Sequence, residues 1–372
     1  MLFLFEMLIK DSPKETTVTS QLNRRSVLGL STVAAAGTVL GLGAAVLASA
    51  SKTPGTVLLA ASTQTPLDEA KDTVAAIYRA ESKRAGGTWH SFISVADPGG
   101  TPLPAVDAGS GTVVTANSVN KIAVATAVLD KIDRGLLSLS QTVDVTADII
   151  IADGDGVFRL DGAYPSSITL GHAMAALLTV SDDTAVRLCG LVCPAAELNQ
   201  ILVSKGFPNT QVVPVANPNR FYLGSTTPME MHNLLRALVN GTLLSASSTS
   251  YLLNVLRSPI AFTDGIRRVM SSGDRARVAT KAGWFAAGRE EAGIMFDTVG
   301  NPLLTYALFA DNVPGASDFG ATNPAVQARS VMGPVFLRAV DMIASGTAGG
   351  TRHAASGTRA FPALPYHPSN GG

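Results

Sequence analysis

Charged side chains are scarce in this sequence. They make up 15% of its 372 residues, and 28 Lys and Arg balance 28 Asp and Glu to a formal net charge of zero. A chain without an excess or a run of basic residues lacks the electrostatic footprint of a nucleic-acid-binding protein, so we expect no nucleic-acid partner. No segment repeats at a fixed period, which excludes solenoids and propellers. The hydrophobic fraction of 46% is sufficient to bury a large core, and we expect a globular protein.

Cysteine is nearly absent, with Cys189 and Cys193 as the two examples. Their four-residue spacing within a predicted helix places the Cβ atoms one above the other but too far apart for a relaxed disulfide, which favours two buried thiols. A bridge remains open as the alternative, provided that the helix unwinds at Pro194. No cluster of His, Cys, Asp and Glu has the spacing of a metal site, and we expect neither a metal nor another cofactor.

The first fifty residues have the composition of an export signal. Arg24 and Arg25 stand directly before a weakly apolar, Ala- and Gly-rich run over residues 27–47, and residues 48–50 are small enough for cleavage. The pattern resembles a twin-arginine signal, which predicts an exported, periplasmic or extracellular protein. The alternative is a retained membrane anchor, because the run is about as long as a spanning helix. We favour a signal over residues 1–50 that is cleaved, leaving no stable membrane span.

Apolar periodicity divides the remaining chain into three stretches. A small-residue linker over residues 51–66 precedes a predicted helix at 67–84 and predicted strands at 90–96 and 106–114. The middle stretch is typical of helices, at residues 122–132, 170–180, 184–192, 195–205 and 229–238. Strands return at residues 277–281, 293–297 and 303–310, before a last helix at 323–345.

Strands from both ends of the chain around a helical middle predict one α/β (α+β) domain over residues 67–345. Residues 67–115 and 257–345 form its α/β part, and residues 116–256 form an inserted all-α part. We expect the ligand site in the cleft between the two parts. Residues 346–372 are rich in Gly, Ala, Pro and Ser, and we expect a disordered tail there.

The first motif with chemical meaning is Ser118-Val119-Asn120-Lys121. At the start of a helix, the i, i+3 spacing places Ser118 and Lys121 on one face, with Cβ atoms about 5–6 Å apart. A serine hydroxyl attacks a carbonyl only when a base removes its proton, and a lysine whose pKa is lowered by burial can be that base. Taken alone the motif is weak, because Ser118 as a helix N-cap beside an exposed Lys121 explains it at least as well.

Two further motifs follow in order, Ser181-Asp182-Asp183 and Lys281-Ala282-Gly283. Ser181 stands 63 residues after Ser118, and Lys281 stands 100 residues after Ser181. The three motifs and their spacing resemble the class A β-lactamases, of the serine β-lactamase and penicillin-binding-protein superfamily, whose signature is S-x-x-K, S-D-N and K-T-G. The resemblance includes residues 225–229, which are similar to a Thr-Thr-Thr-Pro segment of the family, and it covers residues 67–345.

The resemblance implies a β-lactamase-like fold, with an antiparallel sheet flanked by helices and the active site where the all-α part meets the sheet. It also implies a β-lactamase-like serine hydrolase that opens a β-lactam or a related amide or ester through an acyl-enzyme. The expected partner is a small β-lactam or a cell-wall peptide-like substrate, and we expect a monomer.

Carried over by position, the catalytic roles fall to Ser118, Lys121, Ser181 and Lys281. Ser118 would attack the carbonyl, and Lys121 would accept its proton. Ser181 would pass a proton to the leaving nitrogen, while Lys281 would support that transfer and attract a substrate carboxylate.

Substrate-binding roles fall to Asp183, Gly283, Trp284 and Arg289. The backbone N–H groups of Ser118 and Trp284 would form the oxyanion hole. A side chain at Gly283 would block a substrate that lies along the strand edge. Arg289 matches a carboxylate-binding arginine of the family only loosely, and a surface arginine paired with Glu290 or Glu291 is the alternative.

The sequence departs from the family in the segment that should supply a base for deacylation. The family places a glutamate in an omega loop, whereas the corresponding residues 207–224 contain no Asp or Glu. Asp183 stands where the family's second motif has an asparagine, and its carboxylate would raise the pKa of Lys121. Ala282 stands where the third motif has a Thr or Ser hydroxyl. We therefore expect slow or altered deacylation. Two alternatives remain open: a penicillin-binding-protein-like peptidase, acyltransferase or esterase, and a non-catalytic protein that binds peptidoglycan or a lactam.

Overall fold

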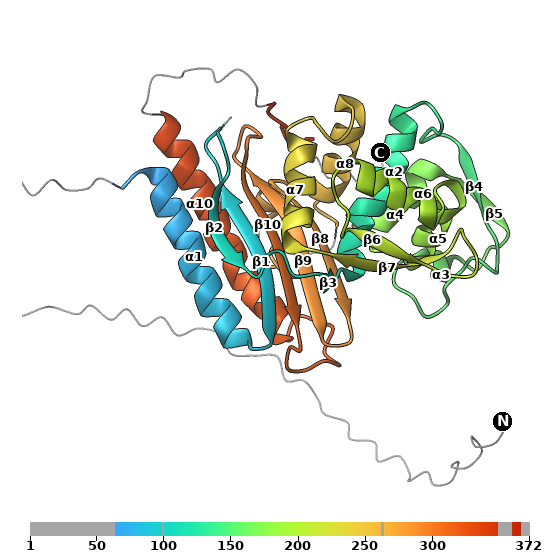
Figure 1. Cartoon of the computed structure of the whole chain (residues 1–372), viewed down its shortest axis with the longest axis horizontal. Coiled ribbons are helices and arrows are strands. Elements are labelled where there is room, and N and C mark those ends of the chain that lie inside the picture. The colour runs from blue at the N-terminus through green and yellow to red at the C-terminus, as the bar shows by residue number, and fades with distance from the viewer. Residues whose placement is uncertain (1–63, 99, 262–263, 349–358, 366–372) are drawn as a thin grey trace, which may run out of the picture. The chain divides into compact units, whose positions relative to one another are not determined.

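A computed structural model describes residues 64–98, 100–261, 264–348 and 359–365 (Figure 1). The predicted signal at residues 1–50 and nearly all of the predicted linker lie outside these ranges. The first described helix, α1 (Pro66–Ala85), begins where the Thr65 side chain accepts a hydrogen bond from the Asp68 N–H. Pro66 suits the first turn because no intrahelical partner is needed for an N–H there.

The centre of the α/β part is a five-stranded antiparallel sheet with the order β2-β1-β10-β9-β8. Its strands are β1 (Thr88–Val95), β2 (Leu103–Ala108), β8 (Val278–Phe285), β9 (Gly288–Phe296) and β10 (Pro302–Asp311). Helices α1 and α10 (Pro324–Ala348) pack together over one face (Figure 1). The strands from the two ends of the chain meet where β1 pairs with β10. The predicted sheet, assembled from both ends around a helical insertion, is confirmed.

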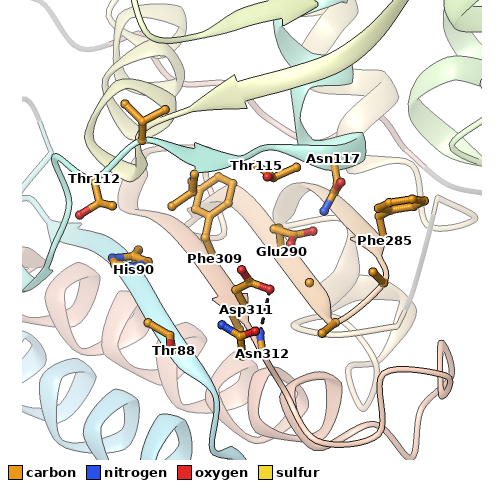
Figure 2. A pocket seen from close by; sticks show the side chains of 16 residues that line it. Thr88, His90, Thr112, Thr115, Asn117, Phe285, Glu290, Phe309, Asp311 and Asn312 are labelled. Atoms are coloured by element: carbon orange, nitrogen blue, oxygen red, sulfur yellow. Dashed lines mark hydrogen bonds between the residues drawn. The ribbon is translucent and has the colours of Figure 1, made fainter.

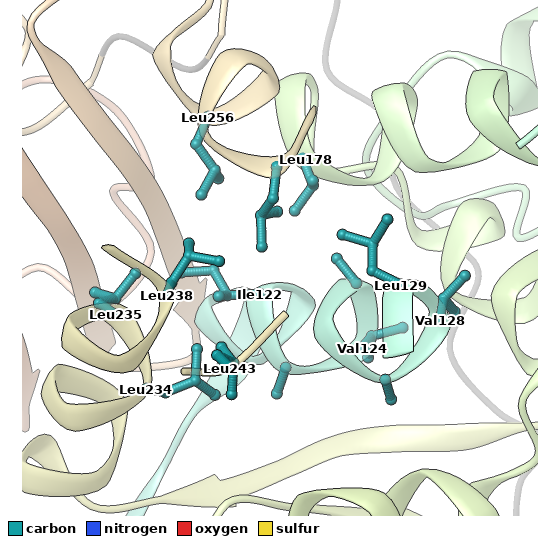
Figure 3. Packing of buried hydrophobic residues seen from close by; sticks show 14 of the residues in the cluster. Ile122, Val124, Val128, Leu129, Leu178, Leu234, Leu235, Leu238, Leu243 and Leu256 are labelled. Carbon is teal, nitrogen blue, oxygen red and sulfur yellow. The ribbon is translucent and has the colours of Figure 1, made fainter. Parts of the chain in front are cut away.

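The helical part surrounds α2 (Lys121–Asp133), whose residues from Lys121 to Leu129 are all buried. A helix that is apolar on every side belongs inside a core. Figure 3 shows its side chains among leucines from neighbouring helices. The helices that contribute to the same core are α4 (Leu170–Thr179), α5 (Asp183–Val192), α6 (Ala195–Ser204), α7 (Pro228–Val239) and α8 (Ala246–Arg257). The packing fixes α2, and with it the motif at its start.

The helical part also contains two short hairpins that the sequence analysis did not predict. One pairs β4 (Thr142–Val145) with β5 (Ser166–Thr169). The other pairs β6 (Gln211–Pro214) with β7 (Phe221–Thr226), and β7 also pairs with β3 (Val114–Thr115). Strands of two to six residues carry too few side chains for a clear period. The one-turn helices α3 (Phe158–Asp161) and α9 (Ser272–Arg275) were missed for the same reason.

Two other predictions need correction. The strand predicted at residues 106–114 ends at Ala108, because Gly109 turns the chain with a φ of +60° and a Cβ there would lie 2.8 Å from His90 Nδ1. The predicted disordered tail is wrong for residues 346–348, which continue α10, and for residues 359–365. Phe361 is buried against Phe296, and its N–H donates to the Gly300 carbonyl oxygen at 2.8 Å. Phe361 thus anchors a segment whose other residues are one arginine, two alanines, two prolines and the exposed Leu364.

The corner between α5 and α6 contains both cysteines. Cys189 and Cys193 are free thiols in the buried core, and burial raises the pKa of each to about 12. The structure therefore agrees with the favoured interpretation of two buried thiols. No described helix is by itself long and apolar enough to cross a membrane; α5 and α6 meet that test only together, as a pair bent by 82°.

Candidate active site

Ser118 lies in a turn of 3-10 helix, η1 (Asn117–Asn120), directly before α2. It is half-buried and does not cap α2, whose N-cap residue is Asn120. The N-cap interpretation of Ser118 is therefore wrong. The Asn120 side-chain amide donates to the carbonyl oxygens of Leu223 (2.6 Å) and Ser225 (2.9 Å), which ties η1 to β7. Asn117 has a φ of +46°, a conformation that non-glycine residues seldom adopt.

Lys121 is completely buried rather than exposed. Its Nζ donates to the Ser181 carbonyl oxygen at 2.5 Å, to Asp183 Oδ1 at 2.7 Å and to Ser181 Oγ at 3.1 Å. These bonds occupy the three protons of an ammonium group. Burial lowers the pKa of Lys121, and the carboxylate of Asp183 opposes that shift. Asp183, which stands where the family has an asparagine, thus raises the pKa of Lys121, as predicted.

Ser181 connects the two lysines. Its Oγ lies 3.1 Å from Lys121 Nζ and 3.0 Å from Lys281 Nζ, and its backbone has a φ of +56°. Lys281 is also buried, and its Nζ donates to the Ala282 carbonyl oxygen at 2.6 Å. Burial, followed by the nearby charge of Lys121, holds the pKa of Lys281 well below its usual range. The structure thus brings three of the four predicted catalytic side chains into one hydrogen-bonded cluster.

The two aspartates after Ser181 differ in what they bind. Asp182 is buried and caps α5 through the Ala185 N–H at 2.9 Å, and it also accepts from the N–H groups of Val157 and Phe158. Asp183, with a side chain 32% exposed, pairs with Lys121 and accepts from the Asp155 N–H at 3.0 Å. Asp182 therefore orders the backbone, whereas Asp183 sets the charge beside the lysine.

Asp155 is a member of this site that the sequence analysis missed. Partial burial and the carboxylate of Asp183 raise its pKa, while Lys121 and Lys281 oppose the rise. The carboxylate of Asp155 therefore interacts electrostatically with both lysines. Its local sequence, Asp153-Gly154-Asp155-Gly156, is that of an ordinary turn, so only the fold reveals this proximity.

Position 283 requires a glycine for a different physical reason from the predicted one. A Cβ at this position would lie 2.8 Å from the Ser118 backbone nitrogen and 3.0 Å from that of Val119. Gly283 therefore allows β8 to approach η1, rather than leaving room for substrate. Trp284, the next residue on β8, is half-buried.

Arg289 is not part of the cluster. It is 1% exposed, and its guanidinium donates to the carbonyl oxygens of Ala286, Ala316 and Asp318 while lying 4.7 Å from the centre of the Phe319 ring. The alternative of a surface arginine is therefore wrong. Its hydrogen bonds to backbone oxygens show that it holds the β8–β9 turn against the loop between β10 and α10.

Residues 207–224 form the β6–β7 hairpin and add no carboxylate to the site. The nearest acidic residue along the chain is Glu230 on α7, which accepts from the Asn209 N–H at 3.0 Å and from Thr210 Oγ1 at 2.8 Å. These bonds fasten the base of the hairpin. Within the described ranges, no group of three or more His, Cys, Asp and Glu side chains is arranged to hold a metal ion.

The antiparallel sheet, the helical insertion and the position of the Ser118 motif at their junction define the fold class of serine β-lactamases and penicillin-binding proteins. A model of the Beta-lactamase enzyme family matches residues 70–332, and the chain belongs to that family.

Solved structures show the same fold at low sequence identity. A β-lactamase from Sphaerobacter thermophilus is 23% identical, with a TM-score of 0.59 over 73% of this chain and 97% of that one. The protein PBP-A is 19% identical, with a TM-score of 0.58 over 72% and 96%. In sequence, β-lactamase AER-1 from Aeromonas hydrophila is 30% identical over 142 residues, which are 37% of this chain and 46% of that protein. The matched region thus spans about half of that relative.

Proposed function

We propose that this protein is a serine hydrolase that opens a β-lactam, or a related amide or ester, through an acyl-enzyme on Ser118 and releases the product slowly. The observation that supports it best is Ser181 Oγ, within hydrogen-bonding distance of both Lys121 Nζ and Lys281 Nζ beside the η1 turn that carries Ser118.

Acylation requires a neutral Lys121. Burial favours that form, and Lys121 Nζ would then take the proton of Ser118 as Ser118 Oγ forms its bond to the substrate carbonyl carbon. The backbone N–H groups of Ser118 and Trp284 would stabilise the resulting oxyanion, since β8 passes η1 closely at Gly283. When the C–N bond breaks, Ser181 would give its proton to the leaving nitrogen and recover one from a neighbouring lysine.

Deacylation requires a base that activates a water molecule. Residues 207–224 offer no carboxylate for this purpose, and Glu230 is bonded to Asn209 and Thr210. The acyl-enzyme should therefore be long-lived.

The same absence favours a second candidate, a penicillin-binding-protein-like peptidase or acyltransferase. The fold of PBP-A supports this candidate, and a mutant of PBP-A is described as an acyl-enzyme complex with penicillin G. Turnover of a chromogenic cephalosporin distinguishes the two, because a hydrolase releases many products per protein and a trapped acyl-enzyme releases about one.

We also propose that the mature protein is exported and monomeric. The Arg24-Arg25 pair before an apolar run supports export, and no observation of the described residues calls for a second copy. The mass of the protein recovered from outside the cytoplasm would locate the cleavage site.

The acyl-enzyme is tested with a fluorescent penicillin. Wild-type protein and a Ser204→Ala control on α6 should be labelled, whereas Ser118→Ala should remain unlabelled with an unchanged circular dichroism spectrum. Labelling of Ser118→Ala would assign the nucleophile to another residue. A wild-type protein that binds the probe without a covalent bond would favour the non-catalytic alternative.

A further inference from the structure

Strands β8 and β9 are covered differently at their two ends. At the β8–β9 turn they line a cavity of about 510 Å³, and Figure 2 shows Phe285 and Glu290 beside it. At the other end β9 finishes at Phe296, and there the C-terminal segment at residues 359–365 packs against the domain. Phe361 of that segment is 7% exposed and belongs to the same hydrophobic core as Phe296.

Three residues contact Phe361, and we call Arg257, Phe296 and Gly300 the strap site. The Phe361 and Phe296 rings meet edge to face, with their centres 6.4 Å apart. The Phe361 N–H donates to the Gly300 carbonyl oxygen at 2.8 Å, and the Phe361 carbonyl oxygen accepts from Arg257 Nη1 at 2.5 Å. Gly300 has a φ of +96°, and a Cβ there would lie 2.3 Å from the Phe361 carbonyl carbon. The strap site thus pairs both backbone groups of one residue and buries its side chain, as peptide-binding sites do.

Two members of the strap site also hold the residues directly before β8. Arg257 Nε donates to the Ala276 carbonyl oxygen at 2.7 Å, and the Phe296 N–H donates to the Arg277 carbonyl oxygen at 2.9 Å. Arg257 is 4% exposed, and a buried cation requires acceptors such as the Phe361 carbonyl oxygen. Since β8 is an edge strand, these contacts contribute to holding its start in place.

The sequence of the C-terminal segment suits it for docking. Pro362 biases Phe361 toward an extended backbone, and Pro365 restricts the segment further. A segment that is restricted before it binds loses less conformational entropy when it docks. The Arg359 guanidinium lies 5.7 Å from the centre of the Phe361 ring and adds a cation–π contact.

We propose that the strap site recognises an extended segment in which an aromatic residue precedes proline, and that its occupant is the chain's own residues 359–365. Docking of this segment fastens the start of β8, the strand that carries Lys281. The proposal does not require acylation of Ser118, so its test is independent of the proposed function.

Hydrogen exchange of the full chain, followed by mass spectrometry, tests the proposal. Phe361→Ala should raise the exchange rate over residues 276–285 by about tenfold, because the contacts that hold the start of β8 are lost. The rate over residues 88–95, in β1, should change less, since two strands separate β1 from β8. Leu364→Ala is the matched control, because this side chain of the same segment is 64% exposed, and it should leave both rates unchanged.

A capped peptide with the sequence of residues 359–365 tests recognition by the strap site that Phe361→Ala leaves empty. At a concentration of about 1–10 mM, comparable to the effective concentration of a tethered segment, the peptide should restore the slow exchange over residues 276–285. The same peptide with alanine in place of phenylalanine should not restore it.

Four results would overturn the proposal: an unchanged rate in Phe361→Ala, an equal rise in β8 and β1, recovery with both peptides, or recovery with neither. If Phe361→Ala does not fold, nuclear magnetic resonance of the wild type decides. The Phe361 N–H should then exchange at least about a hundredfold more slowly than the same amide in the free peptide, and equal rates would contradict docking.

Discussion

The cluster around Ser181 and the β6–β7 hairpin make an instructive comparison, because they correspond to the two halves of one reaction. In the cluster, the Nζ atoms of two buried lysines lie within 3.1 Å of the Ser181 hydroxyl oxygen. One of these lysines, Lys121, directly follows the turn that carries Ser118. The hairpin over residues 207–224 carries no acidic side chain at all. One region has a candidate for every group that acylation needs, and the other lacks the group that deacylation needs.

The two regions also differ in how they are held. Lys121 projects from α2, which is buried in the core, and Lys281 projects from β8, an edge strand whose residues from Val278 to Gly283 are buried. The hairpin lies largely at the surface and is tied down through Asn120 and Glu230. Surface connections tolerate replacement of their side chains far better than core elements do. A family member can therefore change its second half-reaction while preserving the first.

The largest expected effect is a loss of acylation rate in the Lys121→Ala variant, which removes the proposed base from the cluster. Loss of a general base typically costs 10²–10⁴-fold in rate, and hydroxide should restore part of it at high pH. Stopped-flow measurement of penicillin acylation across a pH series tests this expectation. Lys131→Ala, on the same helix but bonded to Val192 and Glu197, should leave the rate unchanged. An unaffected rate in Lys121→Ala would remove Lys121 from the mechanism.

A smaller effect is expected when a carboxylate is added to the hairpin. Gln211 is the position to test, because its backbone oxygen lies 3.5 Å from Asn120 Nδ2, although a glutamate there gives up the bond that Gln211 Nε2 donates to the Thr210 carbonyl oxygen. Gln211→Glu should shorten the lifetime of the acyl-enzyme by about tenfold, less than a fully positioned base would. Asn217→Glu is the matched control, since Asn217 lies in the turn between β6 and β7. Equal shortening in both variants, measured by intact mass, would indicate a loosened hairpin rather than a new base.

The smallest expected effect is that of Asp183→Asn on the pH dependence of acylation. Asp183 raises the pKa of Lys121, so Asp183→Asn should lower that pKa and leave more neutral lysine at a given pH. The acid limb of the acylation rate profile should therefore move to lower pH, with a several-fold gain in rate on that limb. Asp182→Asn should move it less and reduce thermal stability, because Asp182 caps α5. Movement of the limb to higher pH in Asp183→Asn would contradict the assignment of Lys121 as base.

The sequence predicted the long elements and the main motifs because those signals are local or strongly periodic. The helices at residues 67–84 and 122–132 and the strand at residues 303–310 match α1, α2 and β10 to within a few residues. The shared contact of Ser181 with both lysines followed only from the family resemblance, since 100 residues separate Ser181 from Lys281. Asp155, the contact of Gly283 with η1 and the place of Arg289 depend on packing, which no local pattern records.

The central claim is that the acyl-enzyme forms readily and decays slowly, and a time course of intact mass after a single dose of penicillin tests it most directly. If the missing base costs 10²–10⁴-fold, or roughly 3–5 kcal/mol of barrier, an adduct of penicillin mass should accumulate on Ser118 and persist. Ser118→Ala should show no adduct under the same conditions. Product that appears at tens per second without any accumulated adduct would contradict the account, because another group would then supply the base.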